Sequence, residues 1–290
     1  MRTSEPTPEL TPRTLLTGLA FGESPRWHDG RLWFANWGMQ EVVAVDLVGT
    51  SEIMVRVPTT MPFCIDWLPD GRLLVVSGRE GLLLRREPDG SLVTHADLTS
   101  LSRHPWNDLV VDGRGNAYVN TIGFEFPGGE FRPGALALVT PDGVARQVAD
   151  GLAFPNGMAV PPDNATVIVA ESYGARLTAF NIAHDGSLSH RRVWAELPDG
   201  HPDGVCLDAE GAVWYGDVPA RRCVRVREGG DVPQTIDLDR GCFACMLGGA
   251  DGRTLFLMAA DFSNAAAMAG GARTGQVLTV AAPAARAGWP

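Results

Sequence analysis

A hairpin signal that recurs six times along the 290 residues is the strongest constraint on the fold. In each copy, two short apolar runs flank a tight turn that carries Asp, usually with Gly. The positive φ that such turns need is readily adopted by Gly, so this pattern favours a β-hairpin. A repeat of about 40–50 residues with several strands per unit is typical of a β-propeller blade. The turn aspartates stand 41 to 51 residues apart, at Asp29, Asp70, Asp112, Asp163, Asp208 and Asp251.

Weaker hairpin signals lie between the strong ones, as at residues 87–91, 140–143 and 184–187. Two hairpins per unit give four strands. The sequence therefore predicts an all-β, six-bladed β-propeller with four antiparallel strands per blade, built as one domain from residues 14–282. An irregular β-sandwich would not explain the even spacing. Residues 1–13 are expected to be a flexible N-terminal segment and residues 283–290 a frayed tail, while residues 14–19 are expected to pair with the last blade and close the ring.

Composition narrows the classes of function. The net charge of −10 argues against nucleic acid or an anionic membrane as the main partner, and we expect a small-molecule substrate. All 24 basic residues are Arg, and the lack of Lys excludes Schiff-base lysine enzymes and the P-loop. The chain shows no secretory signal and no apolar stretch long enough to span a bilayer. Five cysteines, an odd number, favour free thiols and a cytoplasmic location.

One position in each repeat points to a site. Each inner strand is headed by a residue that propeller symmetry would bring to the mouth of the central channel. Two carboxylates and two carboxamides that face one another are costly to bury unless they are paired. A divalent cation would resolve this, and an all-oxygen set suits Ca²⁺, Mg²⁺ or Mn²⁺. The alternative is a polar plug in which each Asn donates to a neighbouring acid. The six heads are Glu23, Cys64, Asn107, Asn156, Asp203 and Cys245, where the two thiols either line the site or add ligands.

At these residues the chain resembles the SMP-30/gluconolactonase/LRE-like family. Segments 22–27 (GESPRW), 155–158 (PNGM) and 202–205 (PDGV) resemble its three metal-ligand motifs, and Trp106-Asn107-Asp108 resembles its substrate-side asparagine motif. Residues 245–249 (CMLGG) are similar to its last blade. The ordered set of motifs covers nearly the whole chain. The resemblance implies a six-bladed propeller that holds one divalent cation, with Ca²⁺ favoured and Mg²⁺, Mn²⁺ or Zn²⁺ as alternatives. For many members it also implies hydrolysis of sugar lactones.

Residue by residue, the resemblance implies that Glu23, Asn156 and Asp203 ligate the metal. Asn107 would bind substrate or join the metal's ligand shell, and Asp203 would double as the general base. Gluconolactonase-type members often carry an Arg two residues before the motif Asn, where this chain has Pro105. Aromatic residues, including Phe63, make the mouth look more aromatic than a sugar site requires. Candidate substrate-binding residues are Asn107, Arg103, Trp106, Trp37 and Glu171.

The sequence therefore predicts a metal-dependent hydrolase of a lactone or related cyclic ester, with a metal-activated water and Asp203 as the base. No G-x-S-x-G nucleophile elbow is present, so a serine mechanism is not favoured. Two alternatives stay open. The same metal propeller could perform another chemistry, such as phosphotriester hydrolysis or a reaction on a secondary metabolite. The chain could also be a non-catalytic, ligand-binding propeller, since fold does not fix function.

Overall fold

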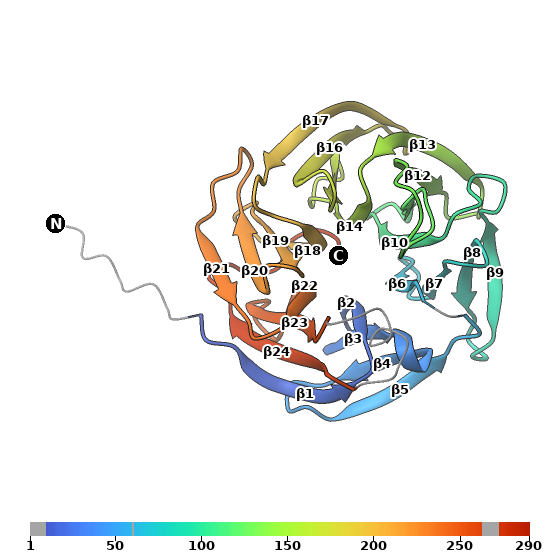
Figure 1. Ribbon diagram of the computed structural model, residues 1–290. Coiled ribbons are helices and arrows are strands. Elements are labelled where there is room, and N and C mark those ends of the chain that lie inside the picture. The colour runs from blue at the N-terminus through green and yellow to red at the C-terminus, as the bar shows by residue number, and fades with distance from the viewer. Residues whose placement is uncertain (1–9, 60, 263–272) are drawn as a thin grey trace.

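Six four-stranded antiparallel sheets surround a central channel in the computed structural model, which describes residues 10–59, 61–262 and 273–290. The sheets follow one another around the ring like the blades of a propeller (Figure 1). Within the described part, the one helical element is the single 3₁₀ turn η1 (Trp37–Met39), which follows the second strand of blade 1. The predicted all-β, six-bladed architecture with four strands per blade is confirmed.

The blades are numbered here in chain order, from the innermost strand outward. Blade 1 contains β2 (Gly22–His28), β3 (Arg31–Asn36), β4 (Glu41–Val45) and β5 (Ser51–Arg56). Blade 2 contains β6 (Phe63–Trp67), β7 (Leu73–Ser77), β8 (Leu82–Arg86) and β9 (Leu92–Asp97). Blade 3 contains β10 (Trp106–Val111), β11 (Ala117–Thr121), β12 (Gly134–Val139) and β13 (Ala145–Leu152).

The second half of the ring repeats the arrangement. Blade 4 contains β14 (Pro155–Ala159), β15 (Thr166–Glu171), β16 (Arg176–Ile182) and β17 (Leu188–Glu196). Blade 5 contains β18 (Pro202–Leu207), β19 (Val213–Asp217), β20 (Arg222–Val226) and β21 (Gln234–Asp237). Blade 6 contains β22 (Gly241–Gly248), β23 (Thr254–Ala260), β24 (Gly275–Ala281) and β1 (Arg13–Leu19).

The first strand of the chain closes the ring. Strand β1 pairs antiparallel with β24, with Arg13 opposite Thr279 and Leu19 opposite Gly275. The N-terminal strand thus supplies the outermost strand of blade 6, and the predicted pairing with the last blade is confirmed. Closure of this kind covers the edge of β24, which would otherwise be free to pair with another chain. Of the segment 1–13 that was expected to be flexible, residues 1–9 lie outside the described residues.

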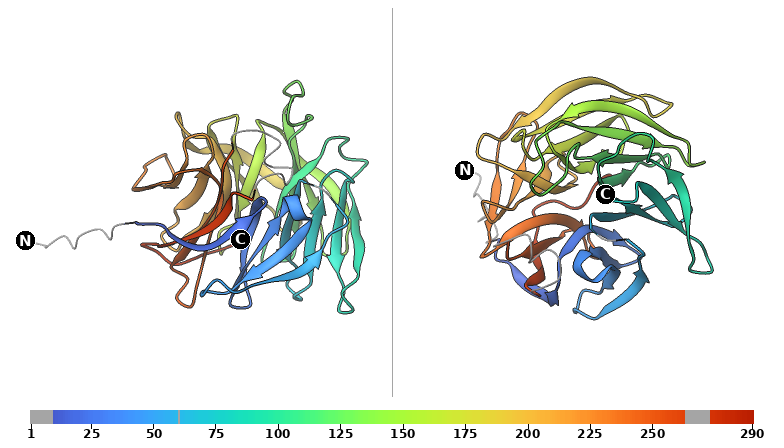
Figure 2. Two further views of the ribbon diagram at one scale, coloured as in Figure 1. Left: turned by 60° about the horizontal axis from the view of Figure 1, so that its bottom comes forward. Right: turned by 45° about the vertical axis from the view of Figure 1, so that its right-hand side comes forward.

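The apolar core lies between neighbouring blades. The middle strands are covered on both faces, which is why they read as continuous apolar runs such as LLVVS in β7 and TLFLMAA in β23. One cluster joins Trp214 of blade 5 with Phe256 of blade 6, and another joins Val76 of blade 2 with Val119 of blade 3. Seen edge-on, the strands run obliquely through the ring between its two faces (Figure 2). The packed blades hold the inner strands at fixed positions around the channel.

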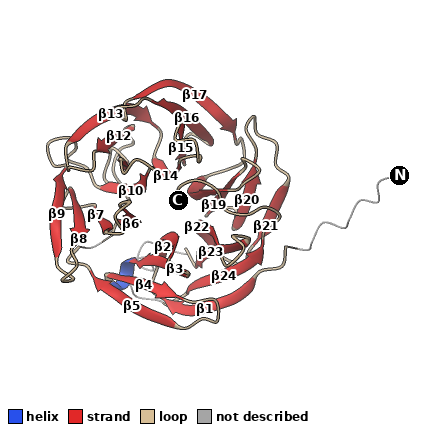
Figure 3. Ribbon diagram, turned by 180° about the vertical axis from the view of Figure 1, so that it is seen from behind, coloured by secondary structure: helices blue, strands red, loops and turns tan. Residues whose placement is uncertain are grey.

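The C-terminal residues differ from the expected frayed tail. Trp289 exchanges two backbone hydrogen bonds with Val160 at the end of β14, and Ala287 donates to the carbonyl of Leu207 at the end of β18. The Trp289 side chain also packs against the apolar cluster between blades 3 and 4. Views from both sides place the C-terminus in the middle of the ring (Figures 1 and 3). Small residues and Pro suggested fraying, but the one large apolar side chain anchors this segment.

All five cysteines are free and buried. Cys206 and Cys245 lie closest, with their sulfur atoms 3.8 Å apart. Across the described residues, no helix combines the length and the apolar character needed to cross a membrane.

Candidate active site

Four of the six inner strands carry a local break in strand pairing at the residue that heads the repeat. The register shifts between Glu23 and Arg26 in β2, and between Trp106 and Leu109 in β10. It shifts again between Pro155 and Met158 in β14, and between Pro202 and Val205 in β18. A β-bulge inserts an unpaired residue and re-aims side chains, and bulges are common next to active sites. In this protein the bulges release Glu23, Asn107, Asn156 and Asp203 from regular strand alternation.

These four side chains meet on the lining of one cavity of about 450 Å³. They come from blades 1, 3, 4 and 5 and lie at the start of each inner strand, so the cavity opens at one end of the channel. Cys64, which heads the inner strand of blade 2, also lines the cavity. The C-terminal residues pair with the opposite ends of β14 and β18, and they therefore occupy the far end of the same channel.

The carboxyl groups of Glu23 and Asp203, at the floor of this cavity, lie in surroundings that disfavour their ionised forms. Burial raises the pKa of Glu23 from 4.5 to about 8, against a hydrogen bond from the backbone N–H of Ser24. Burial also raises the pKa of Asp203 well above 3.8, and the charge of Glu23 raises it further. Asp203 is half-buried and lines the cavity. Within the described ranges, neither carboxylate forms an ion pair with an arginine or histidine.

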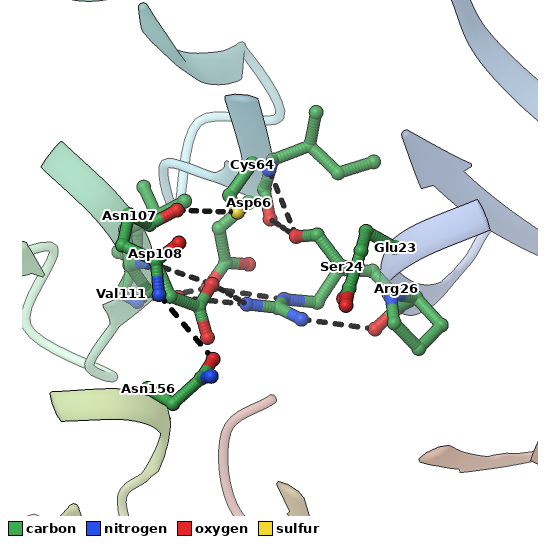
Figure 4. Close-up of polar contacts among 12 residues, drawn as sticks. Glu23, Ser24, Arg26, Cys64, Asp66, Asn107, Asp108, Val111 and Asn156 are labelled. Carbon is green, nitrogen blue, oxygen red and sulfur yellow. Dashed lines mark hydrogen bonds and ion pairs between the residues drawn. The ribbon is translucent and has the colours of Figure 1, made fainter. Parts of the chain in front are cut away.

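The nearest buried cation is Arg26, and other acids engage it. Its guanidinium lies 3.7 Å from a carboxylate oxygen of Asp66 and 3.6 Å from one of Asp108. It also donates to the carbonyl oxygen of Leu109 at 2.7 Å (Figure 4). Burial raises the pKa of both Asp66 and Asp108, and Arg26 opposes that rise. One guanidinium therefore serves two acids, which leaves negative charge at the cavity floor when Glu23 and Asp203 are ionised.

The two asparagines contact each other, and Asn156 contacts one of the acids. The side-chain amide of Asn107 donates to the side-chain oxygen of Asn156 at 3.4 Å (Figure 4), and the Asn156 amide donates to the Ser172 hydroxyl at 3.4 Å. Ser172 in turn donates to the carbonyl of Pro202, next to Asp203, at 2.7 Å. A hydrogen bond from Asn156 to Asp203 lowers the pKa of that carboxyl against the effect of burial. These contacts hold the two amide groups beside Asp203.

The donor set fits a divalent cation that prefers oxygen. Two carboxylates and two carboxamides supply oxygen ligands only, and excess negative charge surrounds them, as Ca²⁺ and Mg²⁺ sites require. Within the described part of the chain, no three His, Cys, Asp or Glu side chains gather in a way that could hold a metal. The site would therefore depend on the amide oxygens as well as on Glu23 and Asp203. The hydrogen-bonded plug uses the same groups, but the 3.4 Å amide contacts are at the long end for hydrogen bonds.

Among the predicted substrate-binding residues, Asn107 and Trp37 line the cavity and three others do not. Trp106 is 1% exposed and packs between blades 2 and 3, because it precedes Asn107 on the strand and faces the other way. Arg103 is exposed outside the cavity. Glu171 is fully buried and forms ion pairs with Arg176 and Arg191.

Cys245 also lies outside the cavity. The bulge in β22 falls between Cys242 and Ala244, so the strand register of blade 6 differs from that of its neighbours. Phe243, two residues earlier, reaches the lining, while the Cys245 sulfur packs beside Cys206. Propeller symmetry therefore predicts the position of the inner strand correctly but misses which of its residues faces the cavity.

Sequence reasoning missed Asp108 and most of the aromatic lining. Asp108 follows Asn107, and regular strand alternation would send the two to opposite faces. The bulge in β10 places both of them on the cavity. Phe21, Phe126 and Phe154 lie in segments between strands, whose course around the mouth no repeat pattern predicts. For Asp108, the one signal in the sequence was its position next to Asn107 in the motif Trp106-Asn107-Asp108.

Comparisons with known proteins show the family and the fold. A family model described as the SMP-30/Gluconolactonase/LRE-like region matches residues 21–261. Regucalcin from Xenopus laevis is 27% identical over 251 residues, covering 82% of this chain and 83% of that protein. A 6-deoxy-6-sulfogluconolactonase from Pseudomonas putida is 26% identical over 189 residues, covering 64% and 60%. The solved structure of a luciferin-regenerating enzyme covers 97% of this chain and 98% of its own, with a TM-score of 0.81 and 19% identity, which shows the shared fold.

Proposed function

Because the chain belongs to the SMP-30/gluconolactonase/LRE-like family, we propose that it hydrolyses a lactone or a related cyclic ester. The observation that carries this proposal is the pair of carboxyl groups of Glu23 and Asp203, which line one cavity without an ion-pair partner among the described residues. The substrate is a small molecule, because the cavity has a volume of only about 450 Å³. Similarity to proteins named as a sugar lactonase and as regucalcin supports the same class.

A divalent cation fits the donor set. Glu23, Asn156 and Asp203 would hold it, with Asn107 beside them. The all-oxygen ligands suit Ca²⁺, Mg²⁺ or Mn²⁺ better than Zn²⁺, and Ca²⁺ stays our prediction. When bound, such a cation polarises a carbonyl oxygen and lowers the pKa of water. Five free cysteines suit a reducing compartment, so a cytoplasmic location stays our prediction.

The chain's own residues supply the proton transfer and the positioning. Asp203 accepts the proton of the attacking water at a carboxylate oxygen. The water oxygen bonds to the carbonyl carbon, the ring C–O bond breaks, and the alkoxide takes the proton from Asp203. Asn107 and Asn156, which are held by their mutual contact, orient the reacting group. The product is the open-chain hydroxy acid.

The test is a panel of lactones, aryl esters and phosphotriesters, assayed with and without a chelator. We expect lactone hydrolysis that the chelator abolishes and that Asp203→Asn lowers at least about 100-fold. Asp199→Asn, an exposed acid four residues earlier, is the matched control and should keep wild-type rates. If a folded Asp203→Asn protein hydrolyses lactones at the wild-type rate, the proposed base is wrong. Turnover of phosphotriesters alone would favour the other chemistry on this fold, and no turnover at all would favour a ligand-binding propeller.

A further inference from the structure

Two walls of aromatic side chains face each other across the cavity. The first, here called the Phe21 wall, consists of Phe21, Trp37 and Phe243 from blades 1 and 6. Its Phe21 ring stacks on Trp37 with centroids 5.4 Å apart and meets Phe243 edge-on at 4.4 Å. Because these rings pack against one another, the wall is a rigid apolar surface.

The second, here called the Phe154 wall, consists of Phe126, Phe154 and Tyr173 from blades 3 and 4. Phe154 stacks on Tyr173 with centroids 4.7 Å apart and meets Phe126 edge-on at 5.2 Å. In a ring of six blades, blades 3 and 4 lie opposite blades 6 and 1. The space between the walls is therefore a slot with aromatic sides.

Hydrogen-bonding groups stand at the floor and at the rim of this slot. The floor holds the acids and amides described above, while Arg79 and His201 are exposed at the opening. The indole N–H of Trp37 donates to the carbonyl of Phe63 at 2.5 Å, so this donor of the wall is engaged within the protein. Between floor and rim the lining offers few polar groups, among them the hydroxyls of Ser172 and Tyr173, so most hydroxyl groups of a sugar lactone would lose water there without gaining a partner. A flat apolar ring loses nothing of this kind and gains contacts with the aromatic rings of the lining.

We propose that the substrate is a flat, largely apolar lactone, with an aromatic ring fused or attached to it, which slides between the Phe21 wall and the Phe154 wall. The carbonyl of such a lactone would reach the floor, and its ring would fill the slot. This inference rests on the proposed function, because it names the substrate class of the same site. In this inference, the wall residues determine substrate specificity and the floor residues carry out the hydrolysis.

The experiment compares two six-membered lactones, dihydrocoumarin and δ-gluconolactone, after subtraction of their spontaneous hydrolysis. We expect kcat/KM for dihydrocoumarin to be higher by about 100-fold, the discrimination that a hydrophobic pocket achieves against added hydroxyl groups. Equal rates, or a preference for δ-gluconolactone, would overturn the inference and leave the proposed hydrolysis intact.

Variants separate the walls from the rest of the site. Phe126→Ser and Tyr173→Ser each remove one ring from the slot and should lower kcat/KM for dihydrocoumarin about tenfold. The loss for δ-gluconolactone should be smaller, so the ratio of the two kcat/KM values should fall. Val144→Ser is the matched control, because Val144 is an apolar residue of blade 3 that is 59% exposed and does not line the cavity. An equal loss in Val144→Ser would indicate a general effect on the blade and would contradict the role of the walls.

A binding measurement distinguishes failure of this inference from failure of the proposed function. The probe is 3,4-dihydroquinolin-2-one, the lactam with the same rings as dihydrocoumarin, titrated by calorimetry. If neither lactone is hydrolysed but the lactam binds, and binds more weakly to Phe126→Ser, the slot stands and the proposed hydrolysis fails. If the lactam does not bind to the wild-type protein, the slot does not take flat apolar rings and the inference is wrong.

Discussion

Gly157 lies so close to Asp203 that a Cβ atom on Gly157 would stand 2.6 Å from the carbonyl oxygen of Asp203. The same Cβ would stand 2.6 Å from the backbone nitrogen of Val205. Both contacts are with the backbone, so no side-chain rotation could relieve them. The inner strands of blades 4 and 5 therefore approach each other as they do because residue 157 has no side chain. This approach brings Asn156 and Asp203 to one floor.

We expect Gly157→Ala to push β14 and β18 apart and to displace Asp203. Activity should fall at least about tenfold, because small misplacements of catalytic groups are costly. Stability should fall by about 1–3 kcal/mol, the usual cost of overpacking. Thermal unfolding and lactone hydrolysis, measured on the same sample, check both effects.

Gly90→Ala is the control for that variant. Gly90 has a φ of +86° in the turn between β8 and β9, and a Cβ there would meet no atom closer than 3.8 Å. The variant should lose some stability through backbone strain and keep its activity. Full activity in both variants would show that the close approach at Gly157 does not position Asp203.

Removal of divalent metal should destabilise the protein. The floor brings Glu23 and Asp203 together without a cation from the described residues, so a bound ion relieves their repulsion. At a free Ca²⁺ concentration about 100 times its Kd, binding would add about 2.7 kcal/mol of stability. For a chain of this size that corresponds to a rise in Tm of about 5 °C. Thermal unfolding with a chelator and then with added Ca²⁺ measures the shift.

Glu23→Gln removes one of the two charged ligands and should abolish most of that shift. Glu52→Gln is the control. Glu52 is an exposed carboxylate on the outer strand β5 that pairs with Arg31, and its variant should keep the Ca²⁺-dependent rise in Tm. A Ca²⁺ shift that persists in Glu23→Gln would place the ion elsewhere and would remove the main support for the proposed metal site.

Sequence reasoning succeeded where the structure repeats itself. The spacing of the turn aspartates gave the number of blades, and symmetry then brought Glu23, Asn156 and Asp203 to one cavity although they are far apart in the chain. It failed where blades differ. The bulge in β22 moved Cys245 away from the lining, and the bulge in β10 turned Asp108 toward it. A bulge depends on contacts with the neighbouring blade, which a single strand's residues do not reveal.

Glu171 shows a second limit. Its place at the end of an apolar strand suggested a role in substrate binding, but the residues that decide its role lie elsewhere in the chain. Arg176, Thr178 and Arg191 all donate to its carboxylate, and so does the backbone N–H of Ala153. Only the folded blade brings these donors together. Glu171 is therefore a buried anchor of blade 4.

We expect Glu171→Gln to lower stability by about 2 kcal/mol, a loss reduced from that of a fully buried pair because Arg176 and Arg191 are partly exposed. Burial opposes ionisation, but the hydrogen bond from Arg176 and its neighbours lowers the pKa of Glu171 below 4.5. The stabilisation is therefore present above pH 4.5 and is lost as the pH falls through the lower, folded-state value. Urea unfolding of both proteins should show a gap at pH 7 that shrinks below pH 4.5, and a constant gap would contradict the ion-pair role.

The closure of the ring by β1 makes a last prediction. Deleting residues 1–20 removes β1 and uncovers the edge of β24, so we expect a lower Tm and concentration-dependent aggregation. Deleting residues 1–9 leaves β1 and its pairing with β24 in place and should leave Tm unchanged within about 1 °C. Differential scanning calorimetry and light scattering at two protein concentrations measure both effects.

Because Leu19 and its neighbours pack on the blade that also carries Phe243, the longer deletion should weaken lactone turnover as well. If the protein without β1 stays monomeric with an unchanged Tm, the strand is not what closes the ring.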